Sequence, residues 1–211
     1  MASSFRNLLI CALASLVSPA LAAQNAGCHE EVVLDSGPFV LDAKTNLINM
    51  QAPKITQCNV VITADQVIAT ANDFEKQTGQ WRFKGRVRVT VDGAVLSADS
   101  AVFTFTDKRL ARGELAGAAK FEDAHGVDGK EPISGGAGKL VYDYIKKTVQ
   151  LSDNPWVHKP DQYDVEGGCD LIYDLNEQRV TSGSAACAEK NKIRVLPPHK
   201  DGEAPAAAPA Q

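Results

Sequence analysis

The sequence predicts an all-β fold, a solenoid-like or jelly-roll stack of hairpins. Two observations lead to this prediction: apolar and polar residues alternate along several segments, and a phrase built around Ala-Asp occurs twice. Alternation with a period of two is typical of half-buried strands. The chain has 211 residues, of which 44% are hydrophobic, so it can bury a core in one or two domains.

The clearest strand is predicted at residues 81–91, WRFKGRVRVTV. One face carries Trp81 and valines, and the other carries a row of bases, Arg82, Lys84, Arg86 and Arg88. We expect this row to be a solvated outer face, with phosphate binding by its arginines as the alternative. Residues 100–106 and 139–145 alternate in the same way, and turns are predicted at Asp92-Gly93, Asp107-Lys108 and residues 175–177.

The repeated phrase begins ITADQV at residue 62 and LSADSA at residue 96, and weaker copies begin at Ile133 and Val165. Residues 63–76 also show helical spacing and a possible capping box from Thr63 to Gln66. The copy after residue 98 carries strand residues, so both copies are predicted to be strands. The first two copies lie 34 residues apart, from Ala64 to Ala98. Repeats of this length with two strands each predict stacked hairpins.

The repeat places Asp65 and Asp99 at equivalent corners, where each is expected to cap its own turn. The alternative is a pair of catalytic carboxylates, as in a glycan hydrolase. We favour the corners, because aspartates commonly hydrogen-bond the backbone of their own turn. Two other enzyme motifs are also incomplete: SGGAGKL at residues 134–140 lacks the Ser or Thr of a phosphate loop, and no serine lies in a nucleophile elbow. The four histidines are scattered without metal-ligand spacing. The sequence therefore predicts neither an enzyme nor a metal or cofactor site.

The first residues have the features of a secretory signal peptide. Arg6 precedes the short apolar stretch Leu8 to Val17, and Ala20-Leu21-Ala22 is a small-x-small cleavage site. We predict cleavage of residues 1–22, with an uncleaved membrane anchor as the alternative. Acidic residues outnumber basic ones by 26 to 22, which argues against a nucleic-acid partner.

Four cysteines follow the predicted signal peptide: Cys28, Cys58, Cys169 and Cys187. An even number in an exported protein predicts two disulfides. We predict nearest pairing, Cys28 with Cys58 and Cys169 with Cys187, although four cysteines allow three connectivities.

Residues 133–184, preceded by ITADQV and by FKGRVRVTVDGAVLSADSAVF, resemble the LptA (OstA-like) family of periplasmic lipopolysaccharide transport proteins. The shared features include the small residues before Tyr142, the strand around Val149 and Leu151, Gly167, and the Ile172-Tyr173 pair. The resemblance covers roughly residues 35–184. It implies an open, twisted antiparallel β-jelly roll built of repeated hairpins, at residues 35–190. Residues 23–34 would be a lead-in, and residues 191–211 a Pro/Ala-rich disordered tail.

The resemblance also implies a function. The protein would sit in the periplasm, bind lipopolysaccharide through its lipid A, and bridge LptC-like inner-membrane and LptD-like outer-membrane proteins. Head-to-tail self-association is expected through strands near residues 36–42 and 174–184. The alternatives are a structural or adhesive β-repeat protein with a closed core and a polysaccharide-active enzyme on a β-solenoid.

Alternation identifies the residues expected to line a lipid-binding groove. They are Val87, Val89, Phe103, Phe105, Phe121, Leu140, Tyr142, Tyr144, Val149 and Leu151. The alternative is that the same residues only pack on one another as core.

Overall fold

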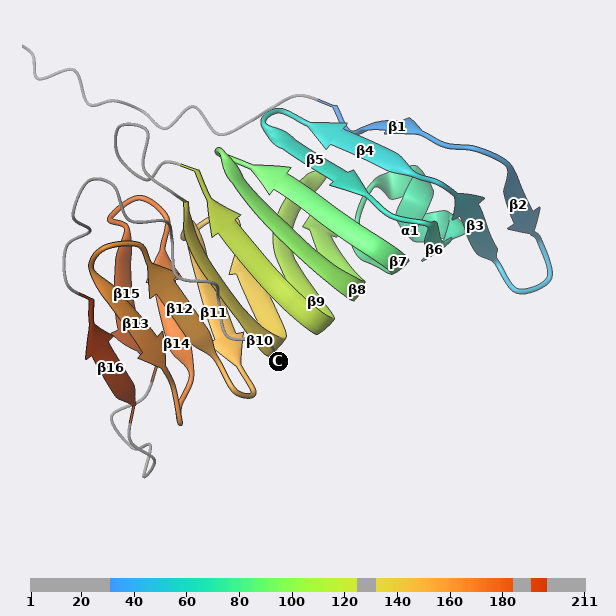
Figure 1. The fold of residues 1–211 in the computed structure, drawn as a ribbon. Helices are drawn as coiled ribbons and strands as arrows, with labels where there is room; N and C mark the ends of the chain where they lie inside the picture. Colours follow the sequence, from blue (N-terminus) through green and yellow to red (C-terminus); the bar gives the residue numbers. More distant parts are fainter. Residues whose placement is uncertain (1–30, 125–131, 184–190, 197–211) are drawn as a thin grey trace, which may run out of the picture.

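The computed structural model describes residues 31–124, 132–183 and 191–196. Within them, sixteen strands form one antiparallel sheet, accompanied by one short helix (Figure 1). The predicted all-β, open antiparallel architecture is confirmed. The described part contains no helix of the length and apolar character that crossing a membrane requires.

Four long strands form the centre of the sheet. They are β7 (Gly79–Val91), β8 (Ala94–Thr106), β9 (Arg109–Asp123) and β10 (Ile133–Asp143), and each pairs with the next. The two halves of each long strand belong to two different layers. The predicted strand at residues 81–91 lies within β7.

The shorter strands extend the two layers. Layer A contains the C-terminal half of β7, which pairs with β5. Its short strands are β1 (Val33–Asp35), β4 (Lys54–Gln57), β5 (Val60–Thr63), β12 (Trp156–Lys159), β13 (Tyr163–Glu166) and β16 (Lys192–Val195). Layer B contains the N-terminal half of β7, which pairs with β6. Its short strands are β2 (Phe39–Asp42), β3 (Leu47–Gln51), β6 (Gln66–Thr70), β11 (Thr148–Ser152), β14 (Leu171–Asp174) and β15 (Arg179–Ser182). The outer two long strands change partners part of the way along: β7 pairs with β6 and then β5, and β10 pairs with β12 and then β11. The sheet is therefore folded over on itself.

The fold line passes through β-bulges at which an aspartate meets a glycine. The register of β7 on β8 shifts between Lys84 and Val87, where Gly85 has a φ of 72°. A Cβ on Gly85 would lie 2.3 Å from Oδ2 of Asp65, and a Cβ on Gly117 would lie 2.5 Å from Oδ2 of Asp99. Glycine is required at both bulges, because neither the space nor the backbone conformation suits another residue. Asp65 and Asp99 thus lie at equivalent corners, as the repeat predicts.

The helix α1 (Ala71–Lys76) corrects the prediction that residues 63–76 are strand throughout. Strand β6 ends at Thr70, whose side chain accepts a hydrogen bond from the backbone N–H of Asp73 at 3.0 Å. Thr70 is the N-cap, so the capping box from Thr63 does not form. The same spacing recurs in the second copy as Thr104 and Asp107, but there Phe103 and Phe105 continue the strand β8 to Thr106. The two copies therefore diverge after the shared phrase, because the first continues with Ala71 and Asn72 and the second with aromatic strand residues.

Tight turns join the long strands at the ends far from the bulges. Asp92 and Gly93 both have positive φ, as do Asp107 and Lys108, so both predicted two-residue turns are confirmed. A four-residue turn follows each of β2, β10 and β14. In each, two backbone N–H groups of the turn donate to the carboxylate of the last strand residue, which is Asp42, Asp143 or Asp174. The turn predicted at residues 175–177 is the last of these.

The sheet extends beyond the predicted domain at both ends. Strand β1 begins at Val33, inside the predicted lead-in. Strand β16 pairs with β13 through Lys192–Val195, which corrects the prediction that disorder begins at residue 191. The predicted signal peptide, residues 1–22, and the rest of the tail, residues 197–211, lie outside the described residues.

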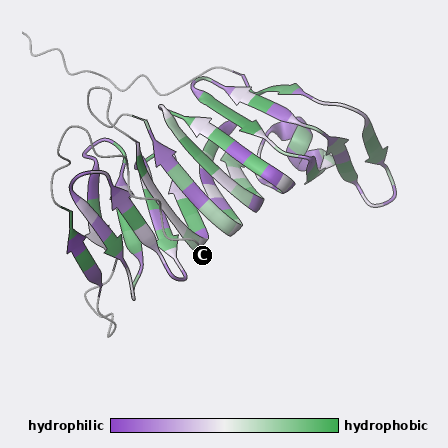
Figure 2. Ribbon diagram, in the orientation of Figure 1, coloured by the Kyte–Doolittle hydropathy of each residue, from purple (hydrophilic) through white to green (hydrophobic). Residues whose placement is uncertain are grey.

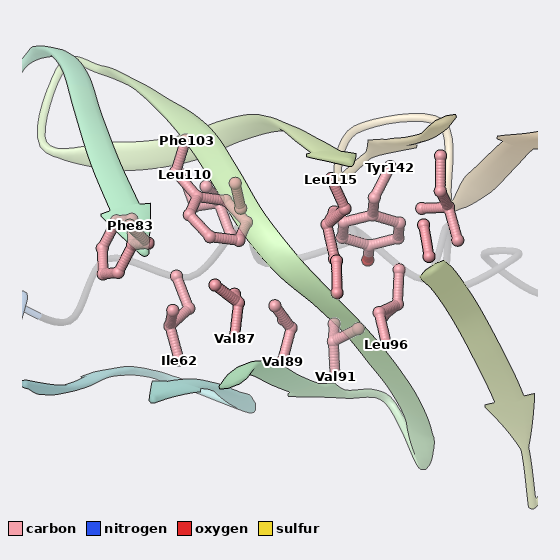
Figure 3. Packing of buried hydrophobic residues seen from close by; sticks show 14 of the residues in the cluster. Ile62, Phe83, Val87, Val89, Val91, Leu96, Phe103, Leu110, Leu115 and Tyr142 are labelled. Carbon is pink, nitrogen blue, oxygen red and sulfur yellow. The ribbon is translucent and has the colours of Figure 1, made fainter. Parts of the chain in front are cut away.

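The core lies between the two layers. Hydrophobic and hydrophilic residues alternate along the strands (Figure 2). Figure 3 shows the inward side chains of layer B, including Phe83, Phe103 and Tyr142, facing Val87 and Leu96 of layer A. Most of the inward apolar residues have exposed fractions of no more than a few per cent and form a single cluster.

Candidate functional site

The residues predicted to line a groove lie in this interior. Nine of them are at most 2% exposed and belong to the apolar cluster: Val87, Val89, Phe103, Phe105, Phe121, Leu140, Tyr142, Val149 and Leu151. Tyr144 is only partly buried and lies in the turn after β10. The same side chains pack on one another, so their role in holding a ligand stays a prediction.

Aromatic rings occupy much of this interior. Phe83 and Phe103 meet edge to face with ring centroids 5.1 Å apart. Phe121 of layer A stacks on Tyr173 of layer B at 5.0 Å, so the two layers touch through their rings. Trp81 lies on the inward face of its strand, as the alternation predicts, and is 1% exposed.

Polar contacts join the two layers on the side opposite the bulges, and we call this row the polar seam. Its first part is Gln57, at the end of β4 in layer A. The Gln57 Nε2 donates to the carbonyl of Lys108 at 2.6 Å, and its Oε1 accepts from the backbone N–H of Leu110 at 3.1 Å. Gln57 is 6% exposed, so these bonds form in a largely dry environment.

The second part of the polar seam is centred on Asp92, in the β7–β8 turn of layer A. Its carboxylate accepts from Lys147, in the β10–β11 turn of layer B, and from the Asn59 side chain. The Tyr144 hydroxyl donates to Oδ1 of Asn59 at 3.2 Å, and Nζ of Lys147 lies 4.1 Å from the centre of the Tyr144 ring. A hollow of about 390 Å³ opens beside Asp92 and Lys147, over the turn at Leu175.

Sequence reasoning missed these seam residues. It identified Asp92 as a turn residue and Tyr144 as an inward residue, and it gave no role to Gln57, Asn59 or Lys147. The signal available in the sequence is their position: each lies at the end of a strand, where polar side chains from two layers can meet.

One cross-layer hydrogen bond is fully buried. The Tyr173 hydroxyl donates to Oδ2 of Asp123 at 2.7 Å, and both residues are 0% exposed. Burial raises the pKa of Tyr173, and the bond to Asp123 raises it further. A phenol that stays protonated can keep donating to the carboxylate, so the pair ties β14 to the end of β9.

The Tyr142 hydroxyl is also buried, and it differs from that of Tyr173 in having no hydrogen-bond partner among the described residues. Tyr142 is 0% exposed, and burial is the main cause that raises its pKa. A buried donor without a partner typically costs about 1–3 kcal/mol. The ring centroids of Tyr142 and Tyr144 lie 6.3 Å apart, so Tyr142 is just inside the polar seam.

The basic row of β7 points away from the interior, as predicted. Arg82, Lys84 and Arg88 are exposed, and Nη2 of Arg86 pairs with Oδ1 of Asp65 at 2.6 Å. The hydrogen bond from Arg86 lowers the pKa of Asp65. A general acid needs a raised pKa, so the structure does not favour Asp65 as the acid of a carboxylate pair.

Two of the four cysteines lie in the described part. Cys58 is in the β4–β5 turn and Cys169 lies between β13 and β14, and each is disulfide-bonded. Cys28 and Cys187 lie outside the described residues, so the pairing stays a prediction. No three His, Cys, Asp or Glu side chains are grouped for a metal ion in residues 31–124, 132–183 and 191–196.

Comparisons with known proteins agree with this fold. The family described as LptA/(LptD N-terminal domain) LPS transport protein matches residues 66–179, more than half of the chain. A crystal structure of LptH from Pseudomonas aeruginosa, the LptA homologous periplasmic component of the lipopolysaccharide transport device, has a similar fold with a TM-score of 0.52. The two chains share 20% identity over 65% of this chain and 93% of that one. No curated protein matches the sequence. On the family match, this chain belongs to the LptA/LptD N-terminal family of lipopolysaccharide transport proteins.

Proposed function

We propose that this protein binds lipopolysaccharide between its two layers and carries it across the periplasm, from the inner to the outer membrane, for outer-membrane assembly. The observation that carries the proposal is the apolar interior, which runs along the folded sheet from Ile48 at one end to Leu171 at the other. Membership of a lipopolysaccharide transport family supports the same conclusion.

The physical need for such an interior is simple. Each CH₂ group of an acyl chain exposed to water costs roughly 0.8 kcal/mol, so a multi-chain lipid cannot cross an aqueous compartment unaided. Side chains that now pack on each other would give way to acyl chains, and the ligand would take over their contacts. The interior can widen about the fold line, because away from that line the layers are joined by side-chain contacts and by the two backbone groups that bond to the Gln57 side chain.

A photo-crosslinking residue placed at single positions tests the proposal. At Phe121, Tyr142 or Tyr144 it should capture lipopolysaccharide in cells, because these residues face or border the interior. At Arg86 or Lys146, whose side chains are 86% and 74% exposed, it should capture none. Equal crosslinking at inward and outward positions, or none at all, would contradict the proposed binding site.

A structural or adhesive β-repeat protein is the second candidate. The observation that favours it is the close packing of the interior, where the largest aromatic residues are already fully buried. Such a protein would bind no lipid, and purified protein that neither carries nor captures lipopolysaccharide would support this candidate.

Bridging two membranes requires contacts at both ends of the sheet. Among the described strands, β2 pairs with β3 alone, and its residues Phe39, Val40 and Leu41 are more than half exposed. At the other end, β15 and β16 are exposed and have one described neighbour each. Pairing of one end with the other end of a second copy would extend the interior as a filament. We propose the same edges as docking strands for LptC-like and LptD-like partners, with export by the signal peptide at residues 1–22.

A further inference from the structure

We infer that the Tyr142 hydroxyl is a hydrogen-bond donor for the bound lipid and receives a carbonyl oxygen at the head of an acyl chain. The inference rests on the proposed function, because it names a polar contact inside the proposed binding site. It assigns Tyr142 a role beyond that of an apolar lining residue.

The first observation is the missing partner. Buried polar groups are nearly always hydrogen-bonded in native proteins, and the other tyrosines of this region follow that rule. Tyr173 donates to Asp123, and Tyr144 donates to Asn59. The Tyr142 hydroxyl has no such partner in the described part of the chain, although the residue is 0% exposed.

The second observation is the position of the hydroxyl. Figure 3 shows it pointing from layer B toward layer A, in the neighbourhood of Leu96, Leu115 and Val91. These three side chains offer the hydroxyl no polar partner, and the charge of Asp92 in the polar seam acts on it without a hydrogen bond. A phenylalanine would supply the same ring without the uncompensated hydroxyl, so packing alone does not account for a tyrosine here.

The third observation is the boundary on which Tyr142 lies. Its ring contacts Tyr144, and Tyr144 in turn lies under Lys147 of the polar seam. An amphiphile whose tail fills the interior and whose polar part leaves through the seam would place its acyl carbonyl between the two. Because burial keeps the pKa of Tyr142 raised, the hydroxyl stays protonated and able to donate.

The test is Tyr142→Phe, with Tyr173→Phe as the matched control. Each variant removes one buried hydroxyl from layer B, but Tyr173 loses a bond to Asp123 and Tyr142 loses none within the described protein. We expect Tyr142→Phe to raise the unfolding temperature and to weaken lipopolysaccharide binding by about two- to tenfold, the range for one neutral hydrogen bond. Tyr173→Phe should lower the unfolding temperature.

Each outcome decides the matter. Unchanged lipopolysaccharide affinity in Tyr142→Phe would overturn the inference and leave the proposed function standing. A lower unfolding temperature in Tyr142→Phe would also overturn it, because the hydroxyl would then have a partner in the unliganded protein. An equal loss of affinity in both variants would point to general loosening of the interior and would overturn it too. Wild-type protein that binds no lipopolysaccharide would overturn the proposed function together with the inference.

Discussion

Two buried tyrosines set a limit to stability at high pH. Burial raises the pKa of Tyr142 and Tyr173 above the usual 10.0. Both hydroxyls therefore stay protonated in the folded protein at a pH where the unfolded chain ionises. Ionisation of these two groups therefore leaves the free energy of unfolding unchanged below pH 10 and lowers it as the pH rises from there toward the raised, folded-state pKa.

We expect the free energy of unfolding to fall above pH 10 by about 1.4 kcal/mol per pH unit for each of the two tyrosines. Urea unfolding between pH 8 and pH 11 measures this slope. Tyr142→Phe should remove one tyrosine's share of it. A slope that is the same in Tyr142→Phe and in the wild type would show that Tyr142 ionises as readily in the folded protein as in the unfolded chain.

At the scale of single residues, the sequence could predict which side chains face inward but not what they touch. Nine of the ten proposed lining residues are buried, because alternation along a strand fixes the face of each residue. The contacts of Asn59, Asp92 and Lys147 could not be predicted, because they join turns that lie far apart in the chain. The missing partner of Tyr142 depends on every neighbour of its hydroxyl, which a one-dimensional pattern does not contain.

At the scale of elements, the exposed edge of β2 is the feature with the clearest consequence. Phe39, Val40 and Leu41 leave an apolar strand edge unprotected, and native proteins usually protect such edges with charges. We expect Leu41→Lys to weaken end-to-end self-association, because a lysine disfavours addition of another strand. Analytical ultracentrifugation over a range of concentrations measures the effect.

The matched control for this prediction is Ile145→Lys. Ile145 is 80% exposed, but it lies in the β10–β11 turn and not on a sheet edge. It should leave the association unchanged. If both lysines weaken association equally, added charge is the cause and β2 is not the docking strand.

The elements themselves were predicted with uneven success, for physical reasons. The long strands and the two-residue turns follow from alternation and from Asp-Gly or Asp-Lys pairs. The helix α1 differs from the predicted strand, because the comparison with the second copy outweighed the helical spacing of residues 63–76. The two-layer folding of the strands depends on glycines at Gly85 and Gly117 that meet aspartates of other strands. Sequence repetition pointed to the aspartates and not to their partners.

At the scale of the whole molecule, the polar seam should control access to the interior. We expect a short bismaleimide bridge between cysteines in Asp92→Cys/Lys147→Cys to slow lipopolysaccharide capture several-fold, because it ties layer A to layer B where they would separate. Capture is measured by stopped-flow fluorescence, with the same variant treated with a monofunctional maleimide as the reference.

A second bridge, in Glu114→Cys/Lys139→Cys, is the matched control. Lys139 and Glu114 form a 3.0 Å ion pair between β9 and β10, within layer B, so their bridge does not cross the seam. Capture should proceed at the reference rate in this variant. Equal rates for both bridged variants would mean that lipid enters elsewhere, for example through the ends of the sheet.

The order of strands in the sheet has a consequence for the length of the protein. From β7 to β11 each strand pairs with the one that follows it in the chain, so the sheet grows along one axis as the sequence proceeds. Inserting or deleting a whole hairpin would therefore change how far the molecule reaches while leaving its cross-section the same. Reach is a quantity that such a chain can adjust by duplication of a single gene segment, without redesign of the surrounding core.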